Sequence, residues 1–121
     1  MRTTMLTRFA RLALLACLPI LTGPVFAADA PSPQLNIRNQ QFVPGQLTVA
    51  AGAKIELLVV NEDALPAEFE SYDLSREVVV PGHSQVKIFI GPLKPGKYRF
   101  FNDFHQQSEG WIVVAAPGAA N

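Results

Sequence analysis

His105 is the side chain of this sequence best suited to metal chemistry, because imidazole is the commonest transition-metal ligand in proteins. It lies in a polar segment, residues 102–109, between an aromatic-rich run at 97–101 and a β-branched run at 110–114. Runs of this kind are typical of strands, so we expect a hairpin whose connecting loop carries the histidine. A loop anchored by two strands can hold a ligand while one side stays open to water. The loop 102–109 is therefore the first place to look for function.

Acidic residues supply further candidate ligands. Glu68 and Glu70 are two residues apart and share one face if their segment is a strand, and Asp103 and His105 share a face if the preceding strand continues through them. Carboxylates with one imidazole suit iron or manganese and tolerate Cu(II) or zinc, whereas Cu(I) prefers sulfur. The same pattern also fits a solvated strand face that binds nothing.

Short apolar runs alternate with turn residues along the chain after the N-terminal segment. Pro-Gly, Ala-Gly and Lys-Pro-Gly sequences separate the runs and favour chain reversals. No long segment there has the 3.6-residue period of an amphipathic helix. The pattern predicts an all-β sandwich or barrel. The expected strands cover residues 35–38, 46–49, 55–61, 68–71, 77–80, 85–90, 97–101 and 110–114.

The C-terminal run resembles the copper loop of cupredoxins. The family pattern Gly-x-Tyr-x-Phe, followed by a ligand position, two residues and a histidine, is similar to residues 96–105, with His105 at the histidine position. Asn102 stands where blue-copper members have a cysteine, and no methionine lies between His105 and Trp111. A blue-copper centre depends on a His₂Cys ligand set, so this departure argues against ordinary blue-copper electron transfer.

Two further motifs extend the resemblance to residues 35–114. Residues 42–52 are similar to the cupredoxin opening F-x-P-x-x-L-x-V-x-x-G, and residues 59–63 to the V-x-N-x-D strand end. The resemblance implies a single Greek-key β-sandwich of about seven to eight strands. It also implies that the segment after Asn61 and the segment containing His105 lie at the same end of the sandwich.

The resemblance also implies a ligand set. In cupredoxins the first histidine ligand lies a few residues beyond the V-x-N-x-D motif, and glutamate occupies that region here. If the sandwich closes as in the family, Glu68, Glu70, Asp103 and His105 converge on one metal ion. The metal expected is copper or iron.

One branch of the family is more similar than the rest. Segments 68–71, 76–77, 90–93, 95–98 and 100–105 resemble the periplasmic cupredoxin-like proteins that accompany bacterial iron permeases. This implies a role in iron uptake, with a membrane iron permease or a periplasmic iron-binding protein as partner. The activity that it implies is oxidation of ferrous iron or transfer of electrons for the permease. A redox-silent copper or iron carrier or chaperone and a metal-free interaction module are the alternatives.

The N-terminus reads as an export signal. Arg2, Arg8 and Arg11 precede a short apolar run, and Val25-Phe26-Ala27 fits a cleavage site, so we expect a signal peptide at 1–27. A disordered leader at 28–34, a domain at 35–115 and a tail at 116–121 would follow. The apolar run is too short to span a bilayer, so a periplasmic protein without a membrane span is expected after cleavage. Lipidation of Cys17 is the alternative.

The net charge of the chain limits the classes of partner that it is expected to bind. Without the three signal arginines, seven Lys and Arg residues face ten Asp and Glu residues, which leaves a net charge of −3. A mildly acidic surface argues against nucleic acid as partner and is compatible with cations. No hydrolase or transferase motif is present. Glu77, which follows Arg76, fits either a ligand or half of a surface ion pair.

Overall fold

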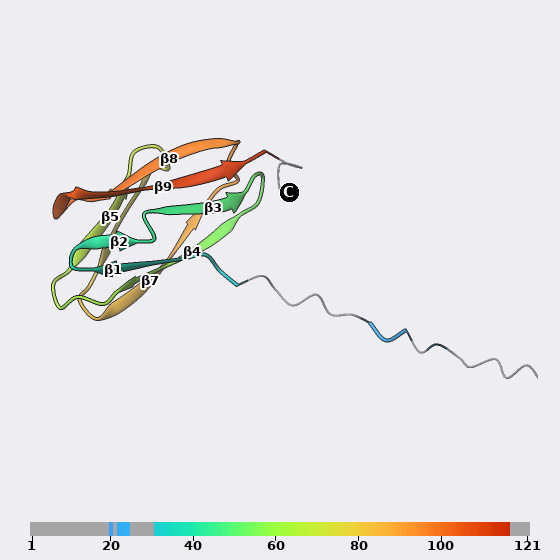
Figure 1. The fold of residues 1–121 in the computed structure, drawn as a ribbon, viewed down its shortest axis with the longest axis horizontal. Helices are drawn as coiled ribbons and strands as arrows, with labels where there is room; N and C mark the ends of the chain where they lie inside the picture. The colour runs from blue at the N-terminus through green and yellow to red at the C-terminus, as the bar shows by residue number, and fades with distance from the viewer. Residues whose placement is uncertain (1–19, 21, 25–30, 117–121) are drawn as a thin grey trace, which may run out of the picture.

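The chain folds as a sandwich of two β-sheets. The structure is a computed structural model that describes residues 20, 22–24 and 31–116. Figure 1 shows the two sheets lying face to face, with strand order β2-β1-β4-β7 in one and β3-β9-β8-β5-β6 in the other. The strands of the described residues are β1 (Gln34–Arg38), β2 (Gln41–Val43), β3 (Gln46–Ala50), β4 (Ile55–Asn61), β5 (Ala67–Ser71), β6 (Arg76–Val80), β7 (Ser84–Ile90), β8 (Gly96–Asn102) and β9 (His105–Ala115). The predicted all-β sandwich is confirmed.

Strand alternation places the core between the sheets. Along β4, Ile55, Leu57 and Val59 are buried at every second position, and their antiparallel partner β7 buries Ile88 and Ile90 in the same way. Successive side chains of a strand point to opposite faces, so this spacing turns one face of the sheet inward. The alternation visible in the sequence is therefore the direct cause of the layer packing.

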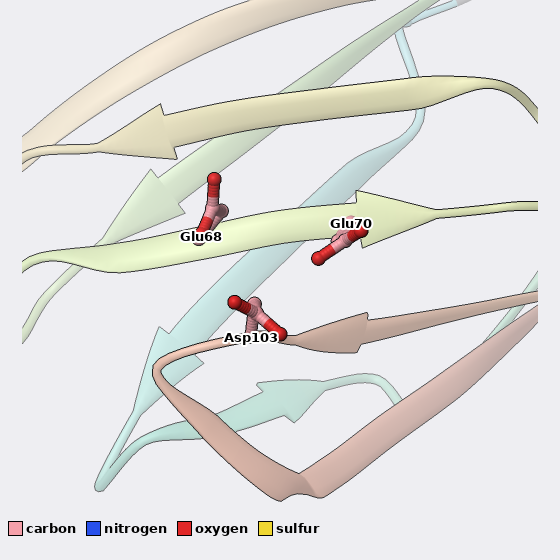
Figure 2. Close-up of side chains that lie close together, drawn as sticks. All are labelled: Glu68, Glu70 and Asp103. Atoms are coloured by element: carbon pink, nitrogen blue, oxygen red, sulfur yellow. The ribbon is translucent and has the colours of Figure 1, made fainter.

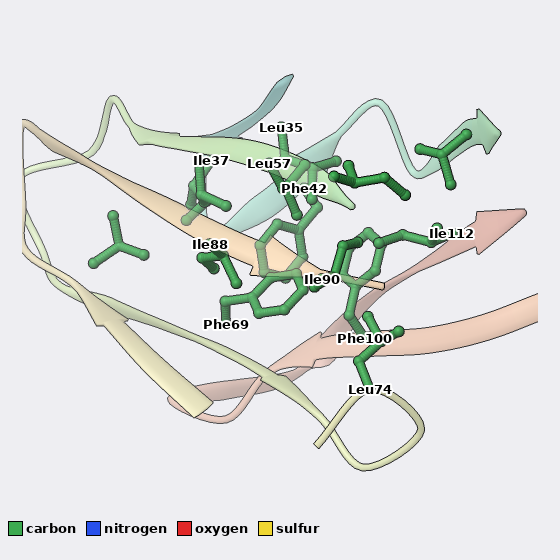
Figure 3. Close-up of a cluster of buried hydrophobic side chains, with 14 of the residues drawn as sticks. Leu35, Ile37, Phe42, Leu57, Phe69, Leu74, Ile88, Ile90, Phe100 and Ile112 are labelled. Atoms are coloured by element: carbon green, nitrogen blue, oxygen red, sulfur yellow. The ribbon is translucent and has the colours of Figure 1, made fainter. Parts of the chain in front are cut away.

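Three phenylalanines from different strands form the centre of the core. Phe42, Phe69 and Phe100 have ring centroids 5.0 to 6.1 Å apart, with edge contacts from Phe42 to the other two. Figure 3 shows these rings among the aliphatic side chains of both sheets. Phe69 is fully buried, so β5 cannot rotate about its axis without exposing it. This anchoring fixes which residues of β5 point outward.

The structure corrects several boundaries. The described residues contain nine strands instead of the predicted seven to eight, because the short β2 pairs with β1. Gln34 belongs to β1 and not to the predicted leader. The expected loop at 102–109 is wrong, since β9 already begins at His105 and the chain reverses through residues 103–104.

The β8–β9 register explains that last error. Phe101 pairs with Glu109, whereas the next residue, Asn102, pairs with His105. Residues 106–108 therefore have no partner on β8 and form a bulge that the polar composition of the segment does not distinguish from a loop. The predicted signal cleavage after Ala27 and the Cys17 alternative lie outside the described residues. Within those residues, no helix has the length and apolar character needed to cross a bilayer.

Candidate metal site on the five-stranded sheet

The β5–β6 hairpin brings acidic residues together on the outer face of the five-stranded sheet. Glu68 and Glu70 flank the buried Phe69, so both point away from the core. The antiparallel register sets Glu70 directly opposite Glu77 on β6. Ser71 stabilises the hairpin turn, because its hydroxyl accepts a bond from Leu74 N (3.1 Å) and donates to a carbonyl of β8 (2.6 Å).

Backbone contacts with the end of β8 bring Asp103 to the same place. The amide of Asp103 donates to the carbonyl of Glu68 at 3.1 Å. In return the amide of Glu68 donates to the side-chain oxygen of Asn102 at 3.0 Å. These two bonds fix the turn after β8 against the first half of β5. The Asp103 carboxylate consequently lies beside the two glutamates of β5.

The three carboxylates form one compact group. Glu68, Glu70 and Asp103 each offer an oxygen, and these oxygens all lie within 4.8 Å of one another. Figure 2 shows Glu68 and Glu70 on β5, with Asp103 facing them from the end of β8. This spacing suits coordination of a single cation by oxygen ligands. The structure thus brings together three of the four predicted ligands.

Burial makes the charge of this group costly. Glu68 is only 7% exposed, and burial raises its pKa above the ordinary glutamate value, with further increases from a hydrogen bond to Glu77 and from that residue's charge. Burial also raises the pKa of Glu70, followed by the negative charges of Asp103 and Glu77. Each of these effects opposes the charged form, and a bound cation would reverse them.

No basic side chain compensates these carboxylates within the described residues. The ion pairs there join Arg38 to Glu62, Lys87 to Glu56 and Arg99 to Glu109, and none involves the group of three. The side-chain amide of Gln106 donates to Asp103 at 2.9 Å, which adds a neutral donor but no charge. The group remains an unbalanced concentration of negative charge.

Tyr72 borders the group on the solvent side. Its side chain is 74% exposed, and its ring contacts that of Phe101 edge-on, with the ring centroids 5.4 Å apart. The negative charge of Glu70 is the main cause of the raised Tyr72 pKa. The phenol therefore favours its neutral, hydrogen-bonding form beside the carboxylates.

His105 lies near the carboxylate group but does not belong to it. It is the first residue of β9, half-buried, and pairs across the turn with Asn102. Asp103 and His105 do not share a strand face as expected, because β8 ends at Asn102 and the chain turns between them. The ligand role of His105 stays a prediction.

Asn102 has a structural role at the position where blue-copper proteins have cysteine. Its side chain is 2% exposed, and its oxygen accepts bonds from the amides of Glu68 (3.0 Å) and Phe104 (3.1 Å). It holds the β8–β9 turn against β5. With this neutral amide in place of a thiolate, the residues at this end do not fit a blue-copper centre.

Glu77 is the functional candidate that the sequence left open. Its suggested ion pair with Arg76 is not present among the ion pairs of the described residues, because the Arg76 guanidinium donates to the carbonyls of Leu74, Ser75 and Phe89. Glu77 instead faces the other glutamates. The β5–β6 hairpin could have predicted the position of Glu77, because pairing Ser71 with Arg76 places Glu70 opposite Glu77.

Comparison with known proteins gives two kinds of similarity. The profile of the cupredoxin-like domain family matches residues 11–114. An uncharacterized protein of Rickettsia prowazekii (strain Madrid E) is 36% identical over 115 residues, covering 86% of this chain and 92% of the relative. The first result spans most of the sequence, and the second shows similarity over nearly the whole of another chain.

Solved structures share the architecture at low identity. Amicyanin from Paracoccus versutus superposes with a TM-score of 0.57 at 18% identity, covering 72% of this chain and 86% of amicyanin. A purple cupredoxin from Nitrosopumilus maritimus gives 0.54 at 16% identity, covering 69% and 100%. A Cu-containing nitrite reductase from Thermus scotoductus gives 0.56 at 24% identity, covering 75% of this chain but 24% of the reductase. Identities this low establish the fold alone.

Proposed function

This chain belongs to the cupredoxin-like domain family, and from that premise we propose that it is an exported protein that binds iron or copper in a bacterial iron-uptake system. Glu68, Glu70 and Asp103 would hold the metal ion, with His105 as a further candidate ligand near the same end of the sandwich. Solved structures with this fold include a copper-containing nitrite reductase and a Cu(I) form of amicyanin. These relatives motivate copper as one of the two metals.

The observation that carries the proposal is the group of three carboxylates around the largely buried residue Glu68. Glu68 is 7% exposed, lies within 4.8 Å of two more carboxylates, and has no ion-pair partner among the described residues. Burying an uncompensated charge costs several kcal/mol in general, and proteins normally offset this cost with a partner or a metal ion. A cation is the ligand that this arrangement would favour most.

The donor chemistry indicates what the site would do with iron as its substrate. Oxygen ligands are hard and prefer Fe³⁺ to Fe²⁺, so they favour transfer of one electron from bound ferrous iron to dioxygen as the acceptor. The oxidised product would then be passed to a membrane permease or to a periplasmic iron-binding protein. The same residues would also fit Cu(II), which tolerates carboxylate and imidazole ligands.

A metal carrier without redox activity is the second candidate. The position of His105 outside the carboxylate group favours it, because the three grouped ligands are all oxygens. An all-oxygen set can hold a hard cation without changing its oxidation state. The two functions share a site and differ only in whether bound Fe²⁺ is oxidised there.

Loss of ferrous iron under air separates these functions. We expect wild-type protein, with copper present, to consume Fe²⁺ faster than Glu68→Gln, as followed with a chromogenic ferrous chelator. His105→Ala tests the predicted histidine ligand in the same assay, and Glu109→Gln is the matched control because Glu109 is already paired with Arg99 at 2.6 Å. Equal rates in all proteins would remove the oxidase function. Equal iron content of wild type and Glu68→Gln after purification would remove the site as well.

A further inference from the structure

The edges of the two sheets differ in how well they are protected from pairing with another chain. Strands β2 and β7 are the edges of the four-stranded sheet, and β3 and β6 are the edges of the five-stranded sheet. An edge strand leaves a row of backbone N–H and C=O groups unpaired, and natural proteins protect such edges with charged side chains, short strands or covering segments. Three of the edges here carry such a protection, and β3 does not.

The three protected edges use length and charge. Strand β2 is only three residues long. Strand β7 contains Lys87, and the guanidinium of Arg76 donates to the β7 carbonyl of Phe89 at 2.8 Å. Strand β6 contains both Arg76 and Glu77, and it lies against β7 on the same side of the sandwich. A short or charged strand is a poor template for a further strand, so these edges are not suited to pairing.

Strand β3 has a free edge without these features. Its five residues, Gln46–Ala50, include no charged residue and no proline. Its hydrogen-bonded neighbour is β9, which pairs with it on one side only, and Figure 1 shows β3 beside β9 at the margin of its sheet. Among the described residues, no backbone hydrogen bond joins the other side of β3 to any segment. Unpaired peptide groups are therefore available along the whole strand.

A groove of about 650 Å³ lies beside this strand. Residues 47–50 of β3 form one wall, and residues 31–33 and 54–56 form the other. The second wall belongs to the four-stranded sheet, because the amide of Leu58 on β4 donates to the carbonyl of Pro33 at 2.9 Å. Strand β2 does not cover this part of the sheet, since its pairing with β1 begins only at Asn36. The groove therefore marks a side of the sandwich that is open to a further strand.

The chemistry of the groove favours an uncharged occupant with alternating apolar residues. Leu47 and Val49 of β3 line the groove and are at least partly buried, whereas Thr48 is exposed. The opposite wall carries one base, Lys54, and one acid, Glu56, so it has no net charge. A neutral groove does not attract an acidic or a basic peptide. An uncharged strand that turns an apolar side chain inward at every second residue is complementary to it.

Strand β3 itself meets this description, and we propose that two copies of the chain associate by pairing their β3 strands antiparallel about a two-fold axis. Thr48 is the middle residue, so the pairing sets Thr48 opposite Thr48 of the second copy and Leu47 opposite Val49. Threonine pairs and aliphatic pairs of this kind stabilise antiparallel strands, and no like charges meet. The two-fold axis uses both free β3 edges and closes the assembly at two copies. This inference does not depend on the proposed metal function.

The dimer should be weak and reversible. Each copy contributes one five-residue strand and the adjoining groove, which is small beside the roughly 1,200 to 2,000 Å² that stable interfaces bury. Sedimentation velocity of the purified full chain, in the presence of a chelator that excludes metal-bridged dimers, measures the association. We expect a shift from monomer to dimer as the protein concentration rises from the low to the high micromolar range. A protein that stays monomeric throughout this range would overturn the proposal.

Substitutions of Thr48 test which strand makes the contact. Because Thr48 is exposed, Thr48→Lys and Thr48→Glu should both fold, as circular dichroism would show, but each sets two like charges opposite one another in the dimer. We expect each variant alone to associate at least about tenfold more weakly than wild type. An equimolar mixture of the two variants should regain association, because opposite charges then face each other. Gln107→Lys, at an exposed position of β9, is the matched control and should associate as wild type does.

The other outcomes identify a different contact or a different occupant. Equal association of wild type and both Thr48 variants would place the contact elsewhere and overturn the proposal, and so would weaker association that the mixture does not restore. Residues 117–121 follow Ala115, the β9 partner of Ala50. If the full chain stays monomeric and a chain that ends at Ala116 forms dimers, the C-terminal segment covers the edge and a second copy is excluded. Weaker association of each variant, restored in the mixture and unchanged in Gln107→Lys, supports the β3 dimer.

Discussion

Two sets of polar side chains lie near one end of this sandwich and differ in how many hydrogen-bond donors and acceptors they meet within the protein. Asn61 donates to the carbonyls of Leu65 (2.8 Å) and Val80 (3.1 Å), and its oxygen accepts from the amide of Asp63 (3.0 Å). Asn102 accepts two backbone amides. Both side chains are almost fully buried, and their bonding partners lie within the protein.

The group of three carboxylates, Glu68, Glu70 and Asp103, has the opposite character. Its carboxylates accept from few donors, they repel one another, and the pKa values of Glu68 and Glu70 rise as a result. Satisfied buried polar groups rigidify a fold, whereas buried groups without partners mark strain or a ligand. The comparison teaches that, at this end of the sandwich, the asparagines maintain the structure and the carboxylates are available for binding.

The largest expected change in stability follows substitution of one of the two hydrogen-bonded asparagines. Asn102→Ala removes the acceptor of two backbone amides, of which that of Glu68 is buried, and should lower the free energy of unfolding by about 2 to 3 kcal/mol. Urea unfolding of metal-free protein measures this change. Gln107→Ala, an exposed residue of the β9 bulge, is the control and should change stability by less than about 0.5 kcal/mol. Equal effects would show that Asn102 is not a structural cap.

Substitution of a carboxylate should change the free energy of unfolding in the opposite direction. Glu68→Gln removes a buried charge from beside Glu70, Glu77 and Asp103, so the metal-free protein should gain about 1 kcal/mol of stability. Urea unfolding in the presence of a chelator measures this gain. Glu109→Gln should show no gain, because it breaks the exposed pair with Arg99. Loss of stability in Glu68→Gln would mean that its charge is compensated in the folded protein.

The smallest effect should be a pH dependence of the metal-free protein. Glu68 and Glu70 have folded-state pKa values raised above the ordinary glutamate value of about 4.3, so the folded state binds protons more tightly than the unfolded state. The contribution of Glu68 and Glu70 to the free energy of unfolding is full below about pH 4.3, the ordinary glutamate pKa. It is lost as pH rises through their raised folded-state pKa values. The effect is partly masked by Glu62, whose pKa is lowered by its hydrogen bond with Arg38 and which acts in the reverse direction.

The difference between wild type and Glu68→Gln isolates this contribution. Melting temperatures recorded between pH 4 and pH 7 should fall more steeply in the wild type as pH rises, and a bound cation should abolish the extra fall by stabilising the charged form. Parallel melting curves for the two proteins would contradict the raised pKa of Glu68. The same curves recorded with Fe³⁺ or Cu(II) test whether the site binds a metal ion.

Local patterns in the sequence determined the fold class and part of the site. The two-residue alternation of strands such as β4 and β7 predicts a buried face directly, because side-chain direction in a strand depends only on residue parity. The same parity puts Glu68 and Glu70 on one face, with Phe69 between them pointing to the core. These conclusions need no knowledge of which strands are neighbours.

Only the tertiary structure decided the strand register and the turn geometry. These two features placed the remaining residues of the candidate site. Glu77 faces Glu70 because of the β5–β6 register, and Asp103 joins them because Asn102 and Glu68 exchange contacts between strands far apart in the chain. His105 is excluded from the group by a turn of two residues where a long loop was expected. Contacts of this kind depend on non-local pairing, so residue spacing along the chain does not determine them.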